Sequence, residues 1–199
     1  MHPPLRYQVS EYDCGPTSVM NAISFLFATR EVPPEFVKSI YGYTLDDFND
    51  LGAPCRRGTS NDSLRYLTSW FNRYRERTGY PLRCEFYEKE GFSLDEDSPL
   101  IRCLKDGGTA VVRYILKVPH YITLTGIDEK YFHVFDPYYW DIQFEENGII
   151  RVEDKPTEMN RLISRDLLRC TEGEHYVLCR EEKSALLFYK EGEGKVVLT

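Results

Sequence analysis

The pattern of apolar and polar positions divides the chain into a helical first half and a strand-rich second half. Helical spacing of apolar residues, with Pro, Gly and capping residues at the ends, predicts helices at 17–28, 35–41, 62–77 and 99–105. Alternating patterns then predict strands at 83–88, 110–117, 121–126, 131–135, 140–144, 149–152, 176–180, 185–189 and 195–198, with a further helix at about 158–168. We therefore expect an α+β protein in which N-terminal helices pack on a C-terminal antiparallel sheet.

The first predicted helix is apolar on nearly every side, which is typical of a buried helix. Pro16 suits its first turn, so Cys14 and Gly15 stand at its N-terminus, where Gly15 would allow a sharp turn beside the sulfur. Unpaired N–H groups and the helix dipole favour an anion there, and the thiolate is the nucleophilic form of cysteine. A cysteine before a helix is more commonly a buried structural residue, so the catalytic interpretation of Cys14 requires partners.

The second half of the chain offers two such partners. Residues 120–137 form a predicted hairpin that turns near Asp128, and facing residues of an antiparallel pair have numbers of constant sum. A sum of about 256 to 258 brings His120 and Asp136 opposite each other to within about one residue. His133 has the opposite parity from Asp136 and points to the other face of its strand. A carboxylate behind one ring nitrogen would hold His120 in the tautomer that a general base needs.

Composition and charge narrow the class of protein. The 199 residues suit one domain, and a net charge of -7 argues against a nucleic-acid partner, although an acidic surface also simply favours solubility. No stretch approaches the roughly 20 apolar residues of a membrane span, and the N-terminus lacks the features of a signal peptide, so we expect a cytoplasmic protein. Its six cysteines lack C-x-x-C or zinc spacing, which favours free, mostly buried thiols and indicates no metal site.

These motifs together resemble the papain-like cysteine peptidases that process bacterial bacteriocin precursors after a double-glycine leader, and in particular their stand-alone relatives. In that family a Gln stands six residues before the Cys, the Cys-Gly pair opens a helix, and the His begins a strand in an H-Y-x-x-L-x-G pattern before an Asp-Pro. The resemblance extends over about residues 7–140, and the matching residues are Gln8, Asp13-Cys14-Gly15-Pro16-Thr17-Ser18, His120-Tyr121, Thr125-Gly126 and Asp136-Pro137. Gly58-Thr59-Ser60 resembles a helix-opening segment of the same group.

The resemblance implies a single papain-like domain over residues 1–199, with a motif-bearing core at about 7–155 and a C-terminal extension at about 156–199. It implies Cys14 as the nucleophile, His120 as general base and acid, and Asp136 as the residue that orients His120. Gln8 and the Cys14 N–H would form the oxyanion hole. The implied partner is a peptide or protein substrate, and the implied chemistry needs no cofactor or metal. The oligomeric state stays open.

Two other activities are compatible with the same four residues. The triad of Cys14, His120 and Asp136 could transfer an acyl group to an amine instead of to water. A non-catalytic relative could instead bind a peptide in the same groove. The presence of all four candidate residues argues against the second alternative, because a binding protein has no need of the complete set.

Overall fold

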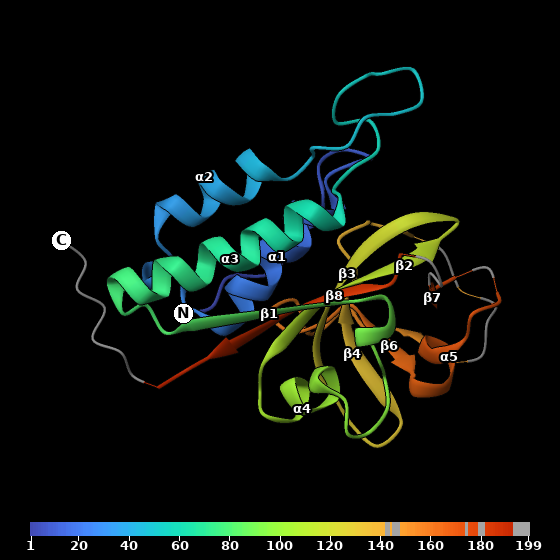
Figure 1. Cartoon of the computed structure of the whole chain (residues 1–199). Coiled ribbons are helices and arrows are strands. Elements are labelled where there is room, and N and C mark those ends of the chain that lie inside the picture. The colour runs from blue at the N-terminus through green and yellow to red at the C-terminus, as the bar shows by residue number, and fades with distance from the viewer. Residues whose placement is uncertain (142–143, 145–147, 174, 179–181, 193–199) are drawn as a thin grey trace.

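The computed structural model has an α+β architecture in which helices surround one antiparallel sheet (Figure 1). It describes all residues except 142–143, 145–147, 174, 179–181 and 193–199. The α-helices in this described part are α1 (Cys14–Leu26), α2 (Pro34–Tyr43), α3 (Asn61–Thr78), α4 (Pro99–Lys105) and α5 (Arg165–Arg169). The strands are β1 (Leu82–Glu88), β2 (Thr109–Leu116), β3 (Val118–Ile127), β4 (Tyr131–Phe135), β5 (Ile149–Arg151), β6 (Arg161–Ser164), β7 (Val177–Leu178) and β8 (Ser184–Lys190).

The sheet brings the last strands of the chain into its centre. Its order is β1-β8-β2-β3-β4-β6-β5, with β7 pairing to β2 beyond the end of β8, and each described pair of strands is antiparallel. β8 lies between β1 and β2, so that it joins two strands that precede it by many residues. Three described segments after residue 155, which are β6, β7 and β8, are therefore members of the sheet.

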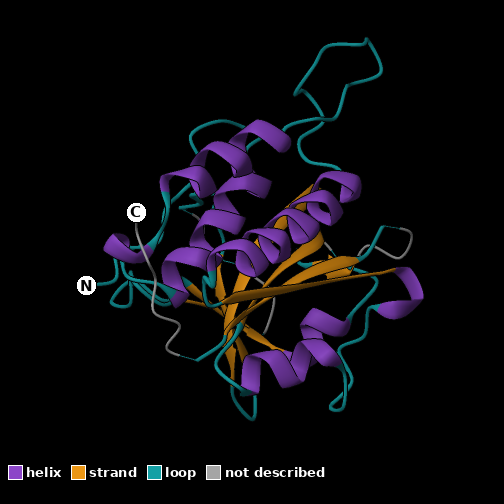
Figure 2. Cartoon of the chain, turned by 60° about the vertical axis from the view of Figure 1, so that its left-hand side comes forward, coloured by secondary structure: helices purple, strands orange, loops and turns teal. Residues whose placement is uncertain are grey.

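Helices cover both faces of the sheet. α1, α2 and α3 lie together on one face, and α4 and α5 lie on the other (Figure 2). The alternation of strand side chains separates two cores, because Val111 packs under α1 to α3 whereas its neighbours Ala110 and Val112 pack toward α4. Leu186 and Leu187 of β8 divide in the same way.

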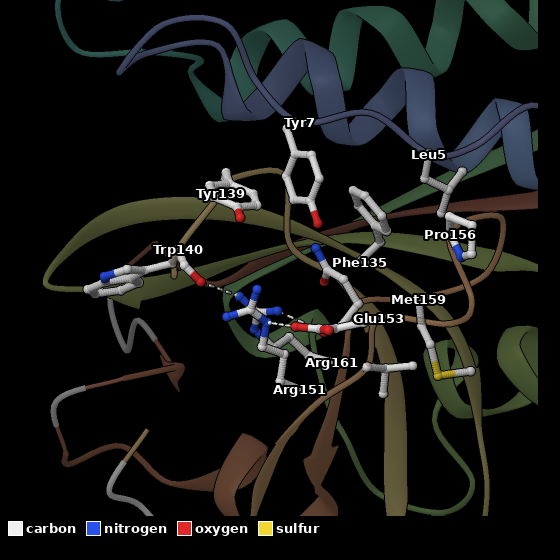
Figure 3. Close-up of a pocket in the computed structure, with 12 residues that line it drawn as sticks. Leu5, Tyr7, Phe135, Tyr139, Trp140, Arg151, Glu153, Pro156, Met159 and Arg161 are labelled. Carbon is white, nitrogen blue, oxygen red and sulfur yellow. Dashed lines mark hydrogen bonds and ion pairs between the residues drawn. The ribbon is translucent and has the colours of Figure 1, made fainter. Parts of the chain in front are cut away.

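The segment before α1 is fixed across the end of β4 (Figure 3). The Asn21 side chain of α1 accepts from the Arg6 N–H at 2.8 Å and donates to the Arg6 carbonyl at 2.9 Å, so that it pairs with this backbone as a strand would. The Tyr7 ring lies 5.4 Å from that of Phe135, measured between centroids, and Leu5 lines a cavity of about 330 Å³ beneath it. These contacts set the path of the chain toward Gln8.

Most predicted helices and strands are confirmed, and α4 and β4 have the predicted bounds. The predicted helix at 158–168 is wrong, because its first half forms β6 and only Arg165–Arg169 is helical. β6 pairs with β4 from Val134↔Arg161 to Tyr131↔Ser164, and its residues alternate between buried and half-buried. Pairing with a strand distant in sequence has therefore overridden a local apolar spacing that suits a helix.

Two further predicted strands are changed by the structure. The described residues of the segment 140–144 are not in a strand, and Trp140 and Phe144 instead place their rings 5.3 Å from the ring of His175. The strand at 176–180 is confirmed at Val177–Leu178, with residues 179 and 180 outside the described part. The predicted strand at 195–198 lies wholly outside the described residues.

The described cysteines are free thiols, but they are less buried than expected. Cys84 and Cys103 are buried in the cores, whereas Cys55 and Cys170 are exposed because they lie in segments that the sheet and helices do not cover. Cys179 lies outside the described residues. In the described part of the chain, no helix has the length and apolar character needed to cross a membrane.

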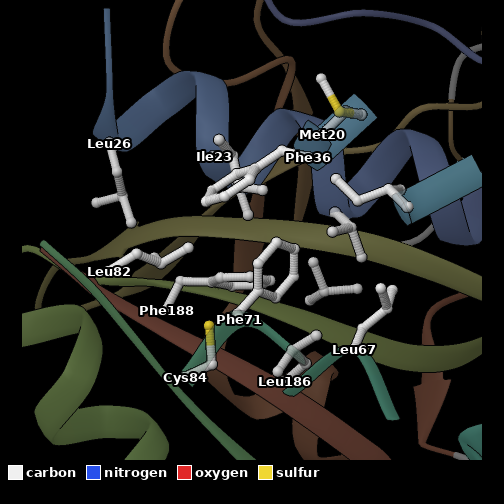
Figure 4. Close-up of a cluster of buried hydrophobic side chains, with 14 of the residues drawn as sticks. Met20, Ile23, Leu26, Phe36, Leu67, Phe71, Leu82, Cys84, Leu186 and Phe188 are labelled. Atoms are coloured by element: carbon white, nitrogen blue, oxygen red, sulfur yellow. The ribbon is translucent and has the colours of Figure 1, made fainter. Parts of the chain in front are cut away.

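The core beneath α2 generates a prediction about stability (Figure 4). Phe36 is fully buried, and its ring makes edge contacts with several aromatic rings, including those of Phe71 at 5.0 Å and Tyr80 at 4.9 Å. Phe36→Ala should lower the free energy of unfolding by about 3 to 5 kcal/mol, measured by urea denaturation. Val37→Ala, at the exposed next position, should change it by only about 0.5 kcal/mol. Equal losses in both variants would contradict this description of the core.

Candidate active site

The first helix places Cys14 against the start of β3. Cys14 is the first residue of α1 and is buried, with 7% of its surface exposed. Ser18, one helical turn later, donates from its hydroxyl to the Tyr121 carbonyl at 3.0 Å, and the Thr123 hydroxyl donates to the Ser18 carbonyl at 3.0 Å. These two reciprocal bonds fix α1 along β3, so the N-terminus of the helix lies beside His120.

The hairpin of β3 and β4 brings His120 and Asp136 into contact, as the sequence predicts. His120 Nε2 and Asp136 Oδ1 lie 2.7 Å apart, and both side chains are buried. The register passes through Thr123↔Phe135, with an irregularity between Leu124 and Gly126. His133 stays outside this site, because its Nε2 lies 3.0 Å from an oxygen of Asp128 at the turn.

Burial and charge act in opposite directions on His120. Burial disfavours the charged ring and lowers the pKa of His120, but the charge of Asp136, the charge of Cys14 and hydrogen bonds to both side chains raise it to about 10. Because Nε2 faces Asp136, Nδ1 is the ring nitrogen left for Cys14. The geometry is therefore that of an imidazolium held between a carboxylate and a sulfur at neutral pH.

The Asp136 carboxylate is held by donors from three parts of the chain. Oδ1 accepts from the Tyr138 N–H at 2.8 Å as well as facing His120, and Oδ2 accepts from the Tyr176 hydroxyl at 2.7 Å. Burial raises the pKa of Asp136, but the charge of His120 and these hydrogen bonds outweigh burial and hold the pKa below its ordinary value. The Asn160 side chain also pairs with the Asp136 backbone, with both hydrogen bonds at 2.8 Å.

Gln8 lies in the same cavity as Cys14 and His120. Its backbone N–H donates to the Pro137 carbonyl at 2.8 Å, which connects the segment before α1 to the loop that carries Asp136. Its side-chain Nε2 donates to the Ser10 carbonyl at 2.7 Å, which leaves a second amide hydrogen for another acceptor. Its Oε1 is buried and has no hydrogen-bond partner among the described residues.

The buried Asp13 carboxylate shapes the loop between Gln8 and Cys14. It accepts from the backbone N–H groups of Val9 at 3.1 Å and Ser10 at 2.7 Å, and from the Ser10 hydroxyl at 2.6 Å. Burial raises the pKa of Asp13, but these hydrogen bonds outweigh burial and lower the pKa below its ordinary value. Asp13 thus fixes the distance between the amide of Gln8 and the sulfur of Cys14.

Gly15 is required because the side chain of Thr59 approaches it closely, and not because of the sharp turn that the sequence suggests. It lies inside α1 and has no positive φ, but a Cβ atom at this position would collide with the side chain of Thr59. Thr59 is buried, and its carbonyl accepts from the Tyr121 hydroxyl at 3.2 Å. The next residue, Ser60, caps α3 by accepting from the Ser63 N–H. The predicted helix-opening segment thus packs directly beside the candidate nucleophile.

Cys14 lies at the junction of two cavities. The larger measures about 590 Å³ and is lined mainly by residues of the loop before α3 and of β2 and β3, among them Arg56, Gly58, Thr59 and Arg113. The smaller measures about 330 Å³ and is lined by Gln8, His120, Tyr138 and Trp140, among others. Both cavities include Glu11, Cys14, Val118 and Pro119, so together they form a cleft that passes over the sulfur.

The residues that support the candidate triad cannot be identified from the sequence alone. Asn160 and Tyr176 lie far from the matched motifs, in a region whose local pattern gives no sign of a contact with Asp136. Asp13 stands inside the matched motif, but only its burial indicates its role. In the described part of the chain, no three His, Cys, Asp or Glu side chains gather in a way that could hold a metal ion.

The geometry predicts the titration of His120. Because its pKa is raised to about 10, the imidazole should stay protonated at pH 7 and lose its proton only as the pH approaches that value. In Asp136→Asn the opposing effect of burial should dominate, so the pKa should fall to about 6.5 or lower. NMR of ¹⁵N-histidine measures both values, with the resonances of His133 as an internal control. A pKa near 10 in Asp136→Asn would contradict the pairing.

Comparison with known proteins does not assign this chain to a family. A scan against models of known protein families found no match to this chain, and a search among curated proteins found none either. We therefore infer the function from the side chains around Cys14.

Proposed function

We propose that this protein is a papain-like cysteine peptidase with Cys14, His120 and Asp136 as its catalytic triad. The observation that carries the proposal is the buried His120–Asp136 contact of 2.7 Å, with the other ring nitrogen directed to a cysteine at a helix N-terminus. This combination supplies a nucleophile, a base and a group that orients the base. A reducing compartment keeps the Cys14 thiol available as a nucleophile, and we propose the cytosol.

The proposed reaction proceeds in two halves. The Cys14 thiolate attacks the carbonyl carbon of a peptide bond, and the negative charge moves to the carbonyl oxygen, where the Cys14 N–H and the Gln8 amide donate to it. The tetrahedral intermediate collapses, the C–N bond breaks, and Nδ1 of His120 gives its proton to the leaving amine. A thioester remains on Cys14. His120 then takes a proton from water, and the hydroxide releases the acid and restores the thiolate.

The two cavities define the direction in which a peptide would lie. Since His120 must protonate the leaving amine, the amine side of the substrate belongs in the smaller cavity, which His120 lines. The acyl side then belongs in the larger cavity on the other side of Cys14. That cavity of about 590 Å³ has space for side chains, and it carries Arg56 and Arg113. We therefore expect the residues before the cleaved bond to have side chains larger than those of a double-glycine site.

A peptide-library cleavage profile tests the proposal. The protein should cleave a defined subset of peptides under reducing conditions, and Cys14→Ala should abolish cleavage while leaving the fold intact. Mass spectrometry should detect an acyl group on Cys14 when turnover is quenched early. Addition of an amine acceptor distinguishes hydrolysis from acyl transfer, since hydrolysis leaves a free acid as the main product. Cleavage retained in Cys14→Ala would remove the proposed nucleophile.

A second prediction concerns Gln8 and the oxyanion. Gln8→Ala should lower turnover by about two to three orders of magnitude, because one oxyanion donor is lost. Alkylation of Cys14 by iodoacetamide should continue near the original rate, because the sulfur and His120 are unchanged. Unchanged turnover would exclude Gln8 from the oxyanion hole. Loss of turnover and alkylation together would mean that Gln8 supports the local fold.

A further inference from the structure

The C-terminal part of the chain supplies a buried hydroxyl to the candidate triad. Tyr176 is fully buried, and its hydroxyl donates to Asp136 Oδ2 at 2.7 Å, on the oxygen that does not face His120. It immediately precedes β7, which pairs with β2 through Ile115↔Val177. Pairing of β7 with the sheet thus places the Tyr176 ring behind the carboxylate.

The backbone of Tyr176 adopts a conformation that aromatic residues rarely use. Its φ of 54° lies in the left-handed region, where a bulky side chain is an outlier. Such conformations persist where the surrounding structure fixes them, and they are frequent at functional sites. Here the strained residue is the one whose side chain reaches Asp136.

Tyr176 is held in its donating form. Burial raises the pKa of its hydroxyl well above the ordinary value, and the charge of Asp136 acts in the same direction, whereas Arg161 opposes both. The hydroxyl therefore keeps its proton at neutral pH. A protonated tyrosine can stabilise the carboxylate, but it cannot accept a proton from it.

The buried guanidinium of Arg161 lies near the Tyr176 hydroxyl. Arg161 is 3% exposed, and its guanidinium donates to the carbonyls of Asn160 at 2.8 Å and Trp140 at 3.3 Å. Figure 3 shows it at the base of the cavity under Tyr7. A buried cation is unfavourable without a compensating charge, and the Asp136 carboxylate, which accepts from the Tyr176 hydroxyl, is the negative charge on the other partner of that hydroxyl.

We propose that Tyr176 is a positioning residue of the active site, which holds the Asp136 carboxylate ionised and aimed at His120 with Arg161 behind it. The proposal rests on the proposed function, since it concerns the same triad. It assigns a role to a segment outside the matched motifs. Tyr176 does not touch the reacting atoms and acts through Asp136.

The proposal predicts a change in the pH dependence of Cys14 reactivity. When Tyr176→Phe removes one donor from Asp136, the carboxylate should become protonated at a higher pH, and His120 then loses the partner that keeps it charged. The rate of Cys14 alkylation by iodoacetamide should fall at acid pH, and we call this fall the acid limb. In Tyr176→Phe the midpoint of the acid limb should therefore move to a pH about one unit higher. Peptide-resolved mass spectrometry separates Cys14 from the exposed free Cys55 in the same sample.

Tyr114→Phe is a matched control. Tyr114 is also fully buried, and its hydroxyl donates to a backbone carbonyl, that of Leu168, at 3.2 Å. Both variants lose one buried hydrogen bond, but Tyr114→Phe should leave the acid limb unchanged. If Tyr176→Phe does not fold, Arg161→Gln should move the limb in the same direction by removing the cation behind the hydroxyl.

The outcomes separate this proposal from the proposed function. An upward shift in Tyr176→Phe that is absent from Tyr114→Phe supports the positioning role. A normal acid limb that is the same in the wild type, Tyr176→Phe and Arg161→Gln overturns it and leaves the peptidase proposal standing. If Cys14 of the wild type is alkylated only at alkaline pH, then the proposed thiolate itself fails.

Discussion

The burial of one carboxylate, that of Asp136, is the constraint on which the rest of the candidate site depends. An ionised carboxylate with 1% of its surface exposed costs several kcal/mol unless donors surround it. Here a ring nitrogen of β3, a backbone N–H after β4 and a hydroxyl before β7 provide those donors. Because these groups come from three separate parts of the chain, the site can exist only when the sheet is complete.

The other half of the site depends on a different set of contacts, which connect α1 to the sheet. The Ser18 and Thr123 bonds fix the helix along β3, and Asp13 fixes the loop that leads into it. The two halves meet between Cys14 and His120, and they are also joined where the Gln8 N–H donates to the Pro137 carbonyl and where α1 is bonded to β3. The distance between the Cys14 sulfur and the His120 ring therefore depends on the same contacts that hold α1 to the strand of His120.

The sequence predicts what local rules govern and misses what distant pairing decides. The β3–β4 hairpin brings His120 and Asp136 together because its short turn fixes the register, and the irregularity at Gly126 does not separate them. β6 is missed because its partner β4 lies a long loop away, and the role of Tyr176 is missed because β7 reaches β2 only in the folded sheet. The need for Gly15 is misjudged for the same reason, since Thr59 comes from another element.

Charge balance connects the C-terminal segment to the chemistry proposed for Cys14. The buried groups around Asp136 include two cations, a protonated His120 and Arg161, but Asp136 supplies only one negative charge. A thiolate at Cys14 would add a negative charge beside the protonated His120, and a medium of low dielectric strengthens the attraction between these opposite charges. Formation of a thioester removes the negative charge from sulfur. The site then favours release of the proton from His120, and this is the proton that the leaving amine must receive.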